Sequence, residues 1–116
     1  MLLRASGRTY NQIYDLAAVA GTPEGDGGVP EGEQLVAFAE AVLSDDDAAL
    51  ARARDALITA LGPPGLVDAA GVVGLFNAID RVADATGTPL EPEKAAASAD
   101  FRAALDLDRL ALADRI

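Results

Sequence analysis

The sequence predicts an all-α domain of about five helices with no sheet, and three observations support this fold class. Several stretches repeat apolar residues at the three- and four-residue spacing that marks one face of a helix. No run of alternating β-branched residues is bounded by turn residues, so no strand is predicted. Alanine accounts for 26 of the 116 residues, which favours thin helices packed close together.

We expect residues 1–116 to form a single domain, because this length suits one modest core. Residues 1–21 form an N-terminal helical segment and residues 22–32 a Gly/Pro-rich loop. Residues 33–87 form the helical core, and residues 88–116 a C-terminal helical segment. A core rich in alanine and poor in aromatic residues buries little large side-chain area. We therefore expect a homo-oligomer, a dimer or a multiple of dimers.

The rest of the chain is organised around the stretch Pro64–Gly87, which reads as one amphipathic helix. Pro63 and Pro64 break the preceding helix, Gly87 suits a left-handed C-cap, and Pro89 follows as a stop signal. The apolar face comprises Val72, Leu75, Phe76, Ile79, Val82, Ala83 and Thr86. The opposite side carries Asn77, Asp80, Arg81 and Asp84.

Two glycines inside this helix require an explanation, since each costs about 1 kcal/mol relative to alanine in a helix interior. Gly71 and Gly74 form a patch almost free of side chains together with Ala70 and Ala78. Such a patch lets another helix approach closely. Packing within the chain is the default interpretation, and a dimer seam is the alternative.

The N-terminal segment predicts a helix over residues 9–20 that ends at Gly21, with Ser6 or Thr9 as its cap. Its buried face would hold Tyr10, Ile13, Tyr14 and Ala17. The loop that follows, TPEGDGGVPEG, matches neither phosphate-binding fingerprint and carries acidic residues without lysine. We therefore expect no phosphate site there.

Further helices are predicted over residues 33–43, 46–61 and 93–99. The last of these continues or restarts over residues 100–105, and a turn and a final helical turn follow it. Ser44 and the aspartates at 45–47 supply the N-cap and negative charge for the helix over 46–61. Leu35, Phe38, Ala39 and Val42 share one face of the first of these helices, and Leu50, Ala53, Leu57 and Leu61 form the buried stripe of the second. The three aspartates lack the spaced oxygens and central glycine of a calcium loop, so no metal site is predicted.

Charge and composition exclude several classes of function. The net charge of −10 argues against nucleic-acid binding and against an anionic membrane surface. No run of residues is apolar for long enough to span a membrane, and no signal peptide begins the chain, so we expect a cytoplasmic protein. The absence of cysteine and histidine excludes thiol chemistry, zinc sites built from these residues and imidazole catalysis. No cofactor is predicted.

Three segments resemble the carboxymuconolactone decarboxylase and AhpD-like alkylhydroperoxidase family. They are VPEGEQLVAFAEAVL, LGPPGLVDAAGVVGLFNAIDRVADATGTPLEP and AASADFRAALDLDR, and they extend from about Val29 to Arg109. The most specific part is LFNAIDRVADATGTPLEP. It combines a Phe-Asn pair and an Arg-x-Ala-Asp pattern in the helix with a Gly-x-Pro-Leu pattern directly after it. Asp80 stands where the family pattern has asparagine.

This resemblance implies an all-helical AhpD-like fold and assembly into dimers, trimers or hexamers. Peroxidase members of the family use a Cys-x-x-Cys pair, a histidine four residues later and an upstream glutamate. One alignment sets Ser6–Thr9 at the position of the cysteine pair and Ile13 at that of the histidine, while the glutamate would fall before Met1. The resemblance therefore implies the fold without the peroxidase activity, and a chain short of N-terminal helices.

Three hypotheses about function follow. The first is a scaffold or partner-binding oligomer without catalytic activity, and the second is a carboxylate-dependent enzyme of decarboxylase type. In the second, Arg81 would hold a substrate carboxylate, Asn77 would contribute to binding, and Glu40, Asp80 or Asp84 would act as the base. The non-catalytic interpretation of these residues is a helix-surface cluster in which Arg81 bonds to Asn77 or Asp84. The third hypothesis is a small-ligand binding module with an apolar pocket between helices.

Overall fold

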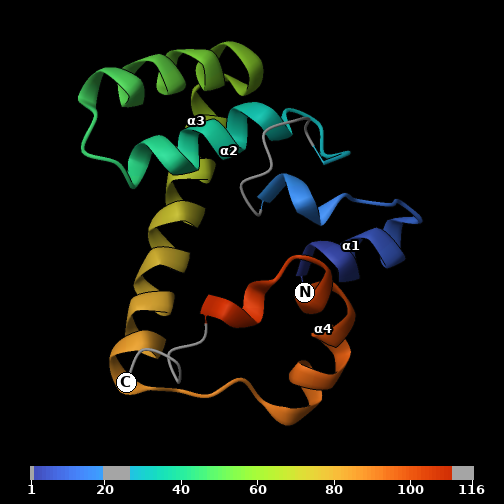
Figure 1. Ribbon diagram of the computed structural model, residues 1–116. Coiled ribbons are helices and arrows are strands. Elements are labelled where there is room, and N and C mark those ends of the chain that lie inside the picture. Colours follow the sequence, from blue (N-terminus) through green and yellow to red (C-terminus); the bar gives the residue numbers. More distant parts are fainter. Residues whose placement is uncertain (1, 20–26, 111–116) are drawn as a thin grey trace.

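The computed structural model describes residues 2–19 and 27–110, and this part of the chain is helical without any strand. The elements are α1 (Leu2–Tyr10), the 3-10 helix η1 (Leu16–Val19), α2 (Gly32–Val42), α3 (Asp47–Thr86), α4 (Pro92–Ala104) and the 3-10 helix η2 (Leu107–Leu110). Figure 1 shows α2 packed against α3, while α1 lies beside α4. The predicted all-α class is confirmed, with four α-helices in the described residues against about five expected.

The N-terminal prediction is wrong in its boundaries. The chain reverses after α1 at Asn11, whose φ of 54° lies in the left-handed region that asparagine tolerates. The backbone N–H of Gln12 then donates to the carbonyl of Gly7 at 2.8 Å, and the carboxylate of Asp15 accepts from the backbone N–H of Ala17. Ile13 is 97% exposed, so the predicted buried face over residues 10–17 does not form. The predicted helix end at Gly21 and residues 22–26 of the predicted loop lie outside the described residues.

The helices predicted over 33–43 and 46–61 are present with ends that differ by about one residue. Asp46 is the N-cap of α3, and its carboxylate accepts from the backbone N–H of Ala49 at 2.9 Å. Phe38 and Ala41 of α2 pack with Leu57 of α3, and these three are the buried hydrophobic residues of the described chain. The stripe expected on α3 is thus buried fully at Leu57 only, and Leu61 remains exposed.

The predicted break before the central helix is real, although it bends one continuous element. Gly62 has φ 72° and ψ 173° inside α3, and Pro63 and Pro64 follow it directly. A backbone with this φ is readily available only to glycine. The kink therefore separates α3 into an N-terminal part that packs on α2 and a C-terminal part, residues 63–86, that ends at the predicted left-handed cap Gly87.

The C-terminal part of α3 does not bury its apolar face within the chain. In Figure 1 it extends away from α2 toward the link that leads to α4. Its large apolar side chains are between 45% and 63% exposed at Val72, Leu75, Phe76, Ile79 and Val82. A Cβ added at Gly71 or Gly74 would meet nothing within 4 Å. The interpretation of these glycines as a site of helix packing within the chain is therefore wrong.

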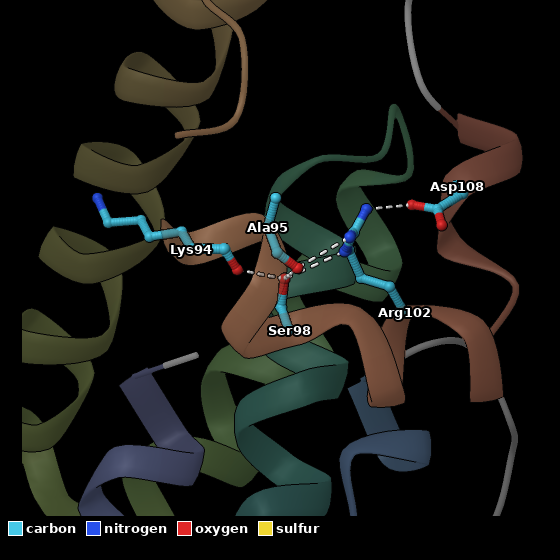
Figure 2. A network of polar contacts seen from close by, with 5 residues as sticks. All are labelled: Lys94, Ala95, Ser98, Arg102 and Asp108. Carbon is cyan, nitrogen blue, oxygen red and sulfur yellow. Dashed lines mark hydrogen bonds and ion pairs between the residues drawn. The ribbon is translucent and has the colours of Figure 1, made fainter. Parts of the chain in front are cut away.

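The last elements follow the predicted order. Residues 88–91 link α3 to α4, Pro92 occupies the first turn of α4, and this helix continues without interruption to Ala104. Figure 2 shows how Arg102 ties η2 to α4: its guanidinium bonds to Asp108 at 2.5 Å, to the hydroxyl of Ser98 at 3.1 Å and to the carbonyl of Ala95 at 3.0 Å. Ser98 is buried and donates to the carbonyl of Lys94, so its hydroxyl is fully satisfied.

We expect Leu57→Ala to lower the free energy of unfolding by about 2–5 kcal/mol, because it deletes the most deeply buried side chain and leaves a cavity. Leu43→Ala is the matched control, since Leu43 is 60% exposed. Urea denaturation followed by circular dichroism measures both variants. Equal effects of the two substitutions would contradict the described core.

Candidate functional site

The residues predicted to carry a site lie on two helices. Asn77, Asp80, Arg81 and Asp84 follow one another along the C-terminal part of α3, and all but the half-buried Asn77 are exposed. Arg81 donates from Nε to Oδ1 of Asn77 at 2.8 Å, one helical turn away. Glu40 is exposed on α2, where it lines a groove with Arg52 and Ala53 of α3.

The Arg81–Asn77 bond bears directly on the choice between ligand binding and helix-surface pairing. A guanidinium that recognises a substrate carboxylate usually presents its fork of donors inside a cleft from which water is excluded. Arg81 instead bonds to its own helix on an exposed surface. This geometry favours the non-catalytic interpretation of the cluster.

A stripe of exposed apolar side chains lies on the C-terminal part of α3, formed by Val72, Leu75, Phe76, Ile79 and Val82. We call it the apolar stripe. It continues into a groove of about 760 Å³ between α2 and α3, since Val72 belongs to both. The other lining residues of the groove include Leu35, Phe38, Leu61 and Val73. The stripe and groove form one continuous apolar surface along the kinked helix.

The charges nearest to the apolar stripe in the sequence are Asp68, which precedes it, and Asp80, Arg81 and Asp84 on the polar side of the same helix. Residues 69–79 contain no charged side chain, and Asp68 and Asp80 flank them. A contact with another apolar surface here would therefore desolvate few ionised groups. Single exposed hydrophobic residues are normal on a protein surface, whereas this stripe brings five large apolar side chains together on one face of a helix.

A second candidate site is a cleft of about 420 Å³ between α1, residues 11–16 and α4. Arg4 of α1 and Asp100 of α4 form a two-pronged pair across it, at 2.8 and 2.6 Å, and the Arg4 guanidinium lies 5.7 Å from the centre of the Phe101 ring. The hydrogen bond and charge of Arg4 lower the pKa of Asp100 to about 2, and the pKa of Arg4 is raised by the same pair.

Sequence reasoning missed this cleft because its two sides are far apart in the chain. Arg4 and Asp100 are separated by 96 positions, and no local pattern links them. Arg4 and Arg8 are one helical turn apart on α1, but the sequence analysis began its first helix at residue 9 and so did not pair them.

Two further properties concern metals and membranes. Within residues 2–19 and 27–110, no group of three or more acidic side chains is placed to hold a metal ion. By length and composition alone, α3 could cross a membrane, with a mean hydropathy of 1.5 over its most apolar window. The sequence had predicted no spanning segment, because no uninterrupted apolar run is present. The kink at Gly62 lies inside this helix.

Comparison of the chain with protein-family models, curated proteins and solved structures gives no match. The resemblance to the AhpD-like family therefore rests on the three segments quoted above and stays a prediction.

We expect Arg4→Gln to return the pKa of Asp100 from about 2 toward its ordinary value of 3.8, since the guanidinium is the main cause of the shift. A lowered folded-state pKa stabilises the fold above the ordinary value and loses this contribution as the pH falls toward 2. The stability difference between the wild type and Asp100→Asn should accordingly shrink over that range. Carboxyl NMR titration measures the pKa, and an unchanged value in Arg4→Gln would contradict the ion pair.

Proposed function

We propose that this chain is an assembly module: an AhpD-like cytoplasmic protein without redox groups that forms a homo-oligomer through the apolar stripe of α3. One observation carries the proposal. Five large apolar side chains on one helix face are about half exposed, whereas three hydrophobic residues of the described chain are buried. A second copy that covers the stripe would supply the core that one chain lacks.

The dimensions of the chain support a missing partner. Its accessible surface is 8486 Å², whereas a folded monomer of this mass exposes about 5,900 Å². The radius of gyration is 15.5 Å, against about 13 Å for a compact domain of the same length. The excess surface is larger than the roughly 800 Å² per subunit that a typical stable interface buries.

A second copy suits this surface better than an unrelated partner, because the requirement for cover is permanent. A chain with so small a core needs its partner whenever it is folded, and obligate interfaces are the more hydrophobic class. Gly71, Gly74 and Ala78 border the apolar stripe along its edge and would let the backbone of a second helix approach closely.

Charge opposes self-association, since each chain carries −10. The carboxylates nearest to the apolar stripe in the sequence are Asp68, which precedes it, and Asp80 and Asp84 on the polar side of the helix. Exposed charges are screened beyond about 8 Å at physiological ionic strength. Burial of apolar area at about 25 cal/mol per Å² would outweigh this repulsion over an interface of ordinary size.

The alternative function is small-ligand binding or carboxylate-dependent catalysis. The groove between α2 and α3 favours it, since about 760 Å³ lies within the size range of ligand pockets. Its lining is almost wholly apolar apart from Asp68, and Arg81 is bonded to Asn77 outside this lining. The same groove would also receive side chains of a second copy, which is why assembly is the preferred proposal.

We expect light scattering to show a mass that is a multiple of 11.8 kDa at micromolar concentration, and Ile79→Asp to reduce it to the single-chain mass. Ile79 is 53% exposed in one chain, so the substitution acts on the interface, not on a core of the single chain as the sequence pattern had suggested. The destabilisation it causes should therefore depend on protein concentration.

Asn77→Asp is the matched control, because it adds the same charge to the polar side of the same helix. It should leave the assembly intact. A wild-type protein that remains at 11.8 kDa, or one that associates only in detergent or lipid, would overturn the proposal.

We expect no thiol-dependent reduction of hydroperoxides, because the chain contains no cysteine to form the thiolate nucleophile. A coupled assay with a dithiol donor and an organic hydroperoxide tests this, with heat-denatured protein as the control. Turnover above that control would refute the interpretation.

A further inference from the structure

We propose that the cleft between α1, residues 11–16 and α4 binds a small organic acid with an apolar body. Arg8 would hold the carboxylate, and Ile13 and Phe101 would contact the body. The cleft of about 420 Å³ is large enough for a single-ring acid and falls in the size range of ligand sites. This site is separate from the apolar stripe, so it stands or fails independently of the assembly proposal.

The cleft is built by a close approach of the chain to α1. Gly7 is buried, and a Cβ there would lie 2.5 Å from the backbone oxygen of Gln12 and 3.2 Å from the ring of Tyr14. The absence of a side chain at Gly7 thus lets residues 12–14 fold back onto the helix. The backbone N–H of Asp15 donates to the carbonyl of Gly27 at 2.8 Å and fastens the other end of this turn.

The two arginines of the cleft have different roles. Arg4 forms a two-pronged pair with the carboxylate of Asp100 and lies over the ring of Phe101. Arg8 lines the same cleft one turn further along α1, and within the described residues no hydrogen bond or ion pair engages its guanidinium. Arg8 is therefore the cation that remains available for an anion.

A neutral donor lies beside this cation. The hydroxyl of Tyr14 donates to Oε1 of Gln12 at 2.5 Å, which fixes the amide so that its NH₂ group remains the available donor. Gln12 and Arg8 line the same cleft. A single cation with an adjacent amide suits the one negative charge and planar fork of a carboxylate, whereas a phosphate dianion would require more positive charge.

The apolar wall explains why the acid should carry a hydrophobic body. Ile13 is 97% exposed, an unusual state for isoleucine, and it lines the cleft with Leu16 and the half-buried Phe101. Among the residues that line the cleft, Arg4 and Arg8 outnumber the carboxylate of Asp100, so the lining carries a net positive charge in a chain of net charge −10. An anion avoids the rest of this surface and is attracted to this cleft.

Benzoate is the probe, with neutral benzamide as its isosteric control, and amide NMR shifts and calorimetry on the full chain are the measurements. We expect benzoate to bind at least about tenfold more tightly than benzamide, which is the usual effect of one charge-assisted contact. The shifts should centre on residues 8, 12, 13 and 101. Equal binding of the two compounds, or shifts elsewhere, would overturn the proposal.

Arg8→Gln should weaken benzoate binding by about tenfold and leave benzamide unaffected. Arg54→Gln is the matched control, because Arg54 is an exposed arginine on α3 that makes the same change in net charge far from the cleft. Equal losses in the two variants would show nonspecific attraction and refute the site. The comparison of benzoate with benzamide on the wild type decides the question even if Arg8→Gln fails to fold.

Discussion

The main physical constraint on this structure is that one chain buries little apolar side-chain area. Alanine-rich helices carry few large side chains, and in the described residues only Leu57 reaches complete burial among them. Half of the exposed large hydrophobic residues of the described chain lie on the C-terminal part of α3. The free energy of folding is a small difference between large terms, so burial of this exposed apolar area would add substantially to the stability.

The kink at Gly62 determines where this exposed apolar surface lies. Without a kink, the helix from Asp47 to Thr86 would continue along a single axis beyond the end of α2. The positive φ of Gly62 and the two prolines that follow it change the direction of α3. The N-terminal part of α3 packs on α2 at Phe38, and the C-terminal part extends away from this pair of helices (Figure 1). The groove between α2 and α3 lies at this junction and joins the packed part to the exposed stripe.

The polar contacts hold the remaining elements together where apolar burial is scarce. The pair of Arg4 with Asp100 joins α1 to α4. Arg102 of α4 bonds to Asp108 of η2, and the buried Ser98 accepts from the same guanidinium (Figure 2). Exposed ion pairs stabilise a fold weakly, so these contacts define orientation more than they contribute stability. The cleft at α1 follows from this arrangement, since it lies between elements that side-chain bonds hold in place without filling the space between them.

The sequence by itself determined the helical class, the C-cap at Gly87 and the break before Pro63, because these features follow from local backbone chemistry. It placed the N-cap of α3 only within residues 44–47, and the structure assigns it to Asp46. It also determined which chemistries the missing cysteine and histidine exclude. It failed at Asn11, where a left-handed turn interrupted the periodic pattern of residues 10–17. Only the tertiary structure decided that Ile79 is exposed and that Arg4 meets Asp100, since amphipathic spacing defines a face without showing what covers it.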